Sequence, residues 1–303
     1  MIVRVKHKLN KWATESGFID HKTMEFLRLA RFDKPIGTFL VLWPAMWALW
    51  IASEGVPSLK HCIVFVLGAV VMRAAGCVIN DIADRNIDGH VERTKARPLA
   101  RGALSLKEAL SFFLILCCIA LGLVLCLNNF AIFWSFGALA LACIYPFMKR
   151  HTFLPQVFLG AAFAWSIPMA FAAVTESVPA LAWILFTATL LWTVAYDTIY
   201  AMIDREDDLK IGVKSTAILF GSADRAIIAA LQVLFVLALC LLGDQLSLGS
   251  FYFLSVVAAS VLLVYQQHLI RLRYKEDCFR AFLNNNWVGL LIFIGIVLDY
   301  AVR

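Results

Sequence analysis

The sequence is poor in charge and lacks the cysteine and histidine patterns of metal and redox proteins. Only 16% of its 303 residues are charged, whereas 62% are hydrophobic, which is outside the balance of ordinary soluble domains. The 8 cysteines form no C-x-x-C pair and the 6 histidines form no H-E-x-x-H pattern. We therefore expect neither a zinc site nor a redox-active cysteine pair.

Secretion and nucleic-acid signals are missing as well. The first residues are charged and amphipathic, without the apolar core and cleavage site of a secretory signal, so 1–34 is predicted to be a cytoplasmic surface segment. No basic stretch is interleaved with aromatic residues, and no nucleic-acid partner is expected. Low-complexity linkers are absent from the sequence. We expect one integral membrane domain over 1–303.

Long apolar runs, in contrast, fill most of the chain. A helix needs about 20 apolar residues to cross the roughly 30 Å of bilayer hydrocarbon. Runs of this kind predict an all-α, polytopic bundle of nine transmembrane helices. The predicted spans lie near 35–53, 61–80, 110–127, 130–147, 156–174, 180–203, 224–243, 250–268 and 286–301.

The basic residues between the spans predict an orientation. Almost all of the 27 Lys and Arg residues lie in the N-terminal segment and in alternate loops, whereas the opposite loops and the C-terminus hold only Lys60 and Arg303. Lys and Arg are retained on the cytoplasmic side. The pattern therefore predicts a cytoplasmic N-terminus and a C-terminus on the opposite side of the membrane.

An acidic stretch, "NDIADRNID" at 80–88, follows the second predicted span directly. On a helix Asn80, Asp84 and Asp88 fall on one stripe, since each residue advances about 100°, and Asp81 points away from it. Gly89 follows at once and is expected to end the helix. A membrane helix thus ends in a row of oxygen-bearing side chains.

A second acidic stretch, "YDTIYAMIDREDD" at 196–208, ends the sixth predicted span. Asp197, Asp204 and Asp208 lie within roughly 40° of a common line on a helix, with Tyr200 beside them. The run Glu206 to Asp208 leaves the choice of ligand open, although the spacing favours Asp208. Two acidic stripes can therefore face each other at one side of the membrane.

Facing carboxylates beside a low-dielectric region repel and need positive charge between them. Hard oxygen ligands without nitrogen or sulfur partners favour Mg²⁺, which usually binds one or two carboxylates and completes its shell with water and substrate phosphates. A basic loop follows each stripe, and such side chains can neutralise a diphosphate. The loop cations are Arg93, Lys95, Arg97, Arg101, Lys210 and Lys214.

Other interpretations of these residues stay open. A single acidic cluster at a membrane boundary is often only a solvated helix end. Arg73, buried two turns before Asn80, could pair with Asp197 or contact an anionic second substrate. Lys149 and Arg150 could be positive-inside anchors or could contact substrate.

These stretches as a set resemble the N-D-x-x-D-x-x-x-D and D-x-x-Y-x-x-x-D motifs of the UbiA superfamily of intramembrane aromatic prenyltransferases. The loops "RTKARPLARG" and "KIGVKSTAILFG" are part of the likeness, which runs over nearly the whole chain. The segments 31–50 and 145–173 are most similar to the members that prenylate 4-hydroxybenzoate. The resemblance implies a bundle with a central cavity, open to lipid, and a cytoplasmic cap formed by the loops after helices two and six.

The resemblance also implies a role for each matching residue. The metal ligands for Mg²⁺ would be Asn80, Asp84, Asp88, Asp204 and Asp208. The diphosphate would contact Arg93, Lys95, Arg97, Lys210 and Lys214. The acceptor would contact Arg73, Asp197, Tyr200 and Arg150. Among these, Asp197, Arg73, Asp84 and Asp204 would serve catalysis most directly.

The implied reaction transfers the prenyl group of an all-trans polyprenyl diphosphate to the carbon ortho to the hydroxyl of 4-hydroxybenzoate, as a step of ubiquinone biosynthesis. Positive charge stabilises the departing diphosphate, and Asp197 would orient the acceptor's hydroxyl or help to remove the ring proton. Related alternatives are another acceptor, such as a naphthoate, a haem or homogentisate. A membrane transporter would also explain intramembrane charge.

Overall fold

The computed structural model describes residues 20–86, 88–90 and 94–303. Within these ranges the chain is helical, and no strand occurs among them. The α-helices are α2 (His21–Leu29), α3 (Ile36–Ala52), α4 (Leu59–Asp84), α5 (Leu106–Val124), α6 (Asn129–His151), α7 (Pro155–Ala164), α8 (Ser166–Thr175), α9 (Ala180–Ile211), α10 (Thr216–Phe220), α11 (Asp224–Gln245), α12 (Ser250–Leu269) and α13 (Lys275–Ala301). Short 3₁₀ turns are η1 (Asp88–His90), η2 (Gly221–Ala223) and η3 (Ile270–Leu272).

The bundle of nine spans predicted from the apolar runs is confirmed. Among the described residues, 8 helical segments are long and apolar enough to cross a membrane, and the shorter apolar helix α3 joins them. Several helices extend beyond the apolar run that predicted them. The second acidic stretch, for example, lies wholly inside the 32-residue helix α9, so the helix carries it past the apolar region in one rigid piece.

The predicted span 156–174 is divided into α7 and α8 at Trp165. Pro168 explains the break, because proline has no N–H to donate to the carbonyl of Ala164 and its ring clashes with that carbonyl. Trp165 uses its indole N–H to contact the Trp134 carbonyl of α6 at 2.8 Å. The break therefore keeps the two short helices packed against α6.

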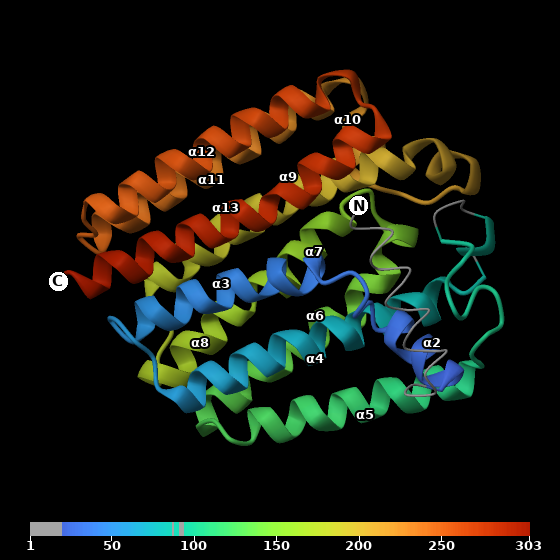
Figure 1. The fold of residues 1–303 in the computed structure, drawn as a ribbon, viewed down its shortest axis with the longest axis horizontal. Coiled ribbons are helices and arrows are strands. Elements are labelled where there is room, and N and C mark those ends of the chain that lie inside the picture. Colours follow the sequence, from blue (N-terminus) through green and yellow to red (C-terminus); the bar gives the residue numbers. More distant parts are fainter. Residues whose placement is uncertain (1–19, 87, 91–93) are drawn as a thin grey trace.

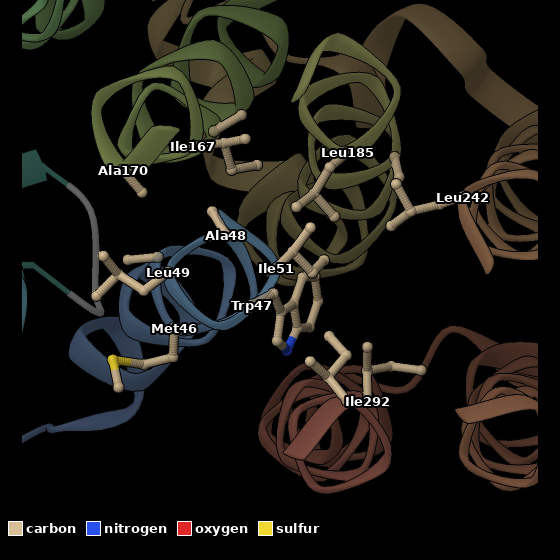
Figure 2. Close-up of a cluster of buried hydrophobic side chains, with 14 of the residues drawn as sticks. Met46, Trp47, Ala48, Leu49, Ile51, Ile167, Ala170, Leu185, Leu242 and Ile292 are labelled. Atoms are coloured by element: carbon tan, nitrogen blue, oxygen red, sulfur yellow. The ribbon is translucent and has the colours of Figure 1, made fainter. Parts of the chain in front are cut away.

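The core lies around α3, between α8, α9, α11 and α13. Figure 2 shows Trp47 of α3 pointing toward Ile292 of α13, with Leu185 of α9 and Leu242 of α11 close by. Trp47 is fully buried, and its ring lies 5.4 Å from that of Trp192. In a bilayer helices associate through close packing more than through the hydrophobic effect, so these aromatic contacts hold the wall of the bundle together.

One end of the bundle carries the loops that follow the acidic stretches. In Figure 1, α2, the loop before α5 and the loop around α10 lie together at the right, and the C-terminus lies at the left. We call this the cap end. The loops after the second and sixth spans form it, as expected, and α2 joins them through an ion pair between the buried Glu25 and Arg101.

A buried carboxylate fixes the second half of the cap end. Asp224 at the start of α11 is fully buried, and it accepts hydrogen bonds from Arg205 of α9 at 3.1 Å and from Arg273 before α13 at 2.7 Å. These hydrogen bonds raise the pKa of the Arg273 guanidinium above its ordinary value. The end of α9 is thereby attached to the helices behind it.

Candidate active site

A cavity of about 1820 Å³ reaches the cap end, and both acidic stretches line it. This volume exceeds that of most small-molecule sites. Most of the predicted site residues lie on its wall. They are Arg73, Asn80, Asp84, Asp88, Arg97, Asp197, Tyr200, Asp204, Asp208 and Lys214. The cavity wall is mainly apolar further from the cap end, with side chains such as Phe65, Leu121 and Phe163.

The first acidic stripe does not form one continuous helix. Helix α4 ends at Asp84, and Asp88 lies in the separate turn η1. The prediction that the helix continues to a cap at Gly89 is therefore wrong. The Asp88 carbonyl instead accepts a hydrogen bond from the Thr94 hydroxyl at 2.8 Å, and its carboxylate pairs with Arg97 at 2.7 Å. The chain thus turns back and brings the basic loop to the acidic stripe.

Asp84 is the most enclosed carboxylate of the first stripe. It is 1% exposed, and its Oδ2 forms an ion pair with Lys149 of α6. Its Oδ1 is buried without a hydrogen-bond partner in the described part of the chain. A buried carboxylate oxygen without a partner is costly, so this atom is suited to receive a cation.

Asp81, which the helical spacing places off the stripe, has its own partners. The carboxylate accepts hydrogen bonds from the Arg31 guanidinium at 2.7 and 2.9 Å, and Arg97 lies 3.1 Å away. Arg31 follows α2 directly and also lines the cavity. Asp81 therefore connects the N-terminal helix to the site.

The second stripe runs along α9, and its residues Asp197, Tyr200, Asp204 and Asp208 all line the cavity. Within the run Glu206 to Asp208, the three side chains face different surroundings. Glu206 points outward and is paired with Lys275 at 3.7 Å, and Asp207 is paired with Lys210 at 3.4 Å. Neither of them lines the cavity, whereas Asp208 does.

The loop after α9 is attached to the corner between α6 and α7. The Lys214 backbone N–H donates to the Lys149 carbonyl at 3.0 Å, and the Lys214 ammonium donates to the His151 carbonyl at 3.3 Å. Two residues later, the Thr216 N–H donates to the buried Gln156 side chain at 3.1 Å. These contacts place Lys214 near Lys149 and join the two halves of the site.

Arg73 lies deeper in the cavity, against the start of α3. A Cβ added at Gly37 would lie 2.2 Å from its Nε, so only glycine leaves room for the guanidinium there. The Nε is buried without a hydrogen-bond partner in the described residues. Tyr145 and Asp197 line the same cavity as Arg73. These three side chains form a polar group that includes the first residue of the second acidic stripe.

The aromatic residues around this polar group could not be named from the sequence. Tyr200 packs its ring on Phe282 of α13, with 4.5 Å between centroids, and Tyr196 contacts the same ring at 6.0 Å. Phe279 and Phe282 also line the cavity. This wall is suited to a flat ring and to shielding a carbocation from water.

Three of the predicted site residues that the structure describes do not line the cavity, and a fourth lies outside the described residues. Lys210 is 74% exposed and is paired with Asp207, so the structure does not support the predicted clamp role. Lys95 is exposed and does not line the cavity. Arg150 is exposed and donates to the Ala83 carbonyl beside Asp84. Arg93 lies outside the described residues.

Three cavity residues were missed or left undecided at the sequence level. Lys149, for which an anchor and a substrate contact stayed equally open, pairs with Asp84. Arg31 and Gln156 lie in the segments 31–50 and 145–173 that share the family resemblance, but neither belongs to an acidic or basic motif that predicts a role. Their partners lie 50 and 60 positions away along the chain, so only the fold brings them to the site.

The oxygen ligands fit a divalent cation that shares its shell with a substrate. Within the described ranges, no three His, Cys, Asp or Glu side chains are gathered into a preformed metal site. Mg²⁺ does not require one, because it commonly uses one or two carboxylates with water and phosphate oxygens. The buried, unpartnered Oδ1 of Asp84 is the atom that best fits this role.

A helical membrane bundle whose cavity ends in facing acidic and basic side chains defines the class, an intramembrane enzyme for a lipid-borne anionic substrate. The chain belongs to the UbiA prenyltransferase family, whose model matches residues 41–294. This membership confirms the resemblance noted in the motifs. It also decides against a transporter.

Curated relatives are similar over nearly the full length. The chain is 62% identical over 278 residues to a 4-hydroxybenzoate octaprenyltransferase of Hahella chejuensis, with 92% of this chain and 93% of that protein covered. It is 59% identical over 282 residues to a protein of the same name from Ectopseudomonas mendocina, with 93% and 95% covered.

Solved structures share the fold. A UbiA homolog from Aeropyrum pernix K1 superposes with a TM-score of 0.76 at 27% identity, covering 86% of this chain and 97% of that one. A UbiA homolog from Archaeoglobus fulgidus, described as bound to GPP and Mg²⁺, gives a TM-score of 0.66 at 18% identity, covering 90% and 99%.

Proposed function

We propose that this chain transfers the prenyl group of an all-trans polyprenyl diphosphate to the ring carbon ortho to the hydroxyl of 4-hydroxybenzoate, a step of ubiquinone biosynthesis. The observation that carries the proposal is the similarity, at 62% identity over 92% of the chain, to a protein named for this activity. The acidic end of a large apolar cavity supports it, because the donor needs both a site for its diphosphate and room for its tail.

The donor's diphosphate binds at the cap end. We assign Asn80, Asp84, Asp88, Asp204 and Asp208 to hold Mg²⁺, which supplies positive charge to the leaving group when bound. The homolog described with GPP and Mg²⁺ supports this choice of cation. Arg97, Lys149 and Lys214 line the same part of the cavity and neutralise phosphate oxygens. Arg93 remains a predicted member of this group.

The acceptor binds below, beside the polar group around Arg73. We assign Arg73 to its carboxylate, and Asp197 and Tyr200 to its hydroxyl side. In the reaction the allylic C–O bond breaks, a C–C bond forms at the ring, and the ring proton leaves. Asp197 either orients the hydroxyl or accepts that proton. Arg150 supports the site indirectly, since it holds the Ala83 carbonyl beside Asp84.

The protein is a multi-pass membrane protein, and we propose the bacterial inner membrane as its location. The cap end faces the cytoplasm, with the N-terminus on the same side and the C-terminus in the periplasm. The distribution of Lys and Arg between alternate loops supports this orientation.

An assay with purified protein in lipid tests the proposed function. 4-Hydroxybenzoate is offered with prenyl diphosphates of graded length, with and without Mg²⁺, and diphosphate release and the prenylated ring are measured. We expect both products only when donor, acceptor and Mg²⁺ are present together. Absence of transfer with every donor would refute the assignment. A parallel assay with a naphthoate or homogentisate in place of 4-hydroxybenzoate would then show whether the protein uses another acceptor.

A further inference from the structure

Three consecutive asparagines in the middle of α13 contact three different helices. The Asn284 side-chain oxygen accepts a hydrogen bond from Gln266 of α12 at 3.0 Å. The Asn285 oxygen accepts one from Trp192 of α9 at 2.8 Å, and the Asn286 oxygen accepts one from Trp43 of α3 at 3.0 Å. Successive residues of a helix point about 100° apart, so one triplet reaches three neighbours.

Only Asn286 of the three also lines the cavity. Its partner determines which end of its amide faces the cavity, because an indole N–H can only donate and therefore selects the amide oxygen. The amide Nδ2 is then directed away from Trp43. No group in the described part of the chain accepts a hydrogen bond from this Nδ2.

Trp43 is itself held in one orientation. A Cβ added at Gly289, one turn beyond Asn286, would lie 2.3 Å from its Cδ1, so glycine allows the indole to rest on the α13 backbone. The indole also stacks on Phe39 at 6.1 Å and contacts Phe293 at 5.8 Å between ring centroids. The Trp43 indole N–H, which fixes the Asn286 amide, therefore cannot easily turn away.

The surrounding wall gives the amide no other polar partner. Asn286 lies one turn beyond Phe282, whose ring packs on Tyr200, and the neighbouring wall residues Phe39, Leu40 and Leu283 are apolar. A few placed polar groups in an apolar pocket typically set the orientation of a ligand. An N–H donor at this position selects an oxygen atom of a bound molecule.

We propose that Asn286 is an acceptor-binding residue, whose Nδ2 donates a hydrogen bond to an oxygen of the aromatic acceptor while Trp43 fixes its amide. The inference deepens the proposed function and rests on it for the identity of the acceptor. The oxygen belongs to the carboxylate or to the hydroxyl of 4-hydroxybenzoate. An aspartate at this position would repel the carboxylate, and it would leave the hydroxyl oxygen without its N–H donor when the phenol O–H is donated to Asp197.

Asn286→Asp tests this directly, because the aspartate still accepts the hydrogen bond from Trp43 but presents an oxygen in place of the amide Nδ2. We expect the KM for 4-hydroxybenzoate to rise about tenfold or more, while the KM for the prenyl diphosphate changes less than twofold. Asn284→Asp is the matched control, since it lies on the same helix and faces α12. Its acceptor KM is expected to equal that of the native protein.

A second variant tests the orientation of the same amide without adding a charge. Trp43→Phe keeps a ring against Gly289 but removes the N–H, so the amide can turn, and we expect the acceptor KM to rise roughly threefold. Benzoate and phenol are then tested as competitive inhibitors of the native protein and of Asn286→Asp. The inhibitor that loses affinity in the variant identifies the oxygen that Asn286 contacts.

Two results would overturn the inference. One is an unchanged acceptor KM in folded Asn286→Asp, and the other is an equal rise in Asn284→Asp. If Asn286→Asp fails to fold, an unchanged acceptor KM in Trp43→Phe overturns it as well. Failure of the proposed function is distinct, because the native protein itself would then show no transfer to 4-hydroxybenzoate.

Discussion

Lys149 of α6 forms an ion pair with Asp84 of α4, and the other oxygen of that carboxylate is buried without a partner in the described residues. The pair joins two helices across the mouth of the cavity. A cation that binds Oδ1 would share the negative charge that Lys149 balances in the metal-free protein. Lys149 would then be able to turn toward a phosphate.

Lys149→Met tests whether this pair stabilises the metal-free protein. Removing one partner leaves a buried charge, and we expect a loss of about 2 kcal/mol or more, seen as a lower melting temperature in EDTA. Mg²⁺ should recover part of the loss. In the double variant Lys149→Met/Asp84→Asn, the melting temperature should return toward the native value, whereas prenyl-transfer activity should stay lost. Equal melting of Lys149→Met and the native protein in EDTA would rule out this role.

Gly37→Ala tests the position of Arg73. The added methyl group would lie 2.2 Å from Nε, so the guanidinium must move, and we expect the KM for 4-hydroxybenzoate to rise about tenfold with little change in the donor KM. Gly122→Ala is the control, because no atom lies within 4 Å of its added Cβ. Similar kinetics for both variants would contradict the assignment of Arg73 to the acceptor.

Arg31→Gln tests the attachment of α2 to the site. The Asp81 carboxylate would lose its hydrogen bonds from Arg31, and α2 would separate more often from α4. We expect faster proteolytic cleavage between α2 and α3 in lipid, with activity lowered several-fold. Arg28→Gln, whose native side chain is 45% exposed, should be cleaved like the native protein. Unchanged cleavage of Arg31→Gln would contradict this attachment.

Lys214 and Lys210 give opposite expectations although both follow the second stripe. Lys214 lines the cavity, so Lys214→Ala should raise the KM for the prenyl diphosphate about tenfold. Lys210 is 74% exposed, so Lys210→Ala should change it less than twofold. A larger effect at Lys210 would return that residue to the diphosphate site.

Much of this arrangement could be predicted from local patterns. The apolar runs predict the spans because each helix must satisfy its own backbone in lipid. The 3.6-residue period places Asp197, Asp204 and Asp208 on one face of α9, and all three line the cavity. Proline alone does not predict the division at Trp165, because α3 and α6 continue through Pro44 and Pro146.

The rest depends on contacts between distant parts of the chain. Helix α4 ends at Asp84 rather than at Gly89, and the following turn is held by Thr94 and Arg97. Spacing on an ideal helix cannot include such a turn. The pairs of Lys149 with Asp84 and of Trp43 with Asn286 join residues 65 and 243 positions apart, which no local pattern encodes.

The most direct test of the site is diphosphate release, dependent on 4-hydroxybenzoate and Mg²⁺, in the native protein, Asp84→Ala and Asp204→Ala. Each variant removes a carboxylate from a different helix, and the account predicts a loss of at least about a hundredfold in kcat/KM for both. Melting temperatures close to the native value would show that the variants are folded. Full Mg²⁺-dependent transfer in both variants would contradict the metal–diphosphate site formed by α4 and α9.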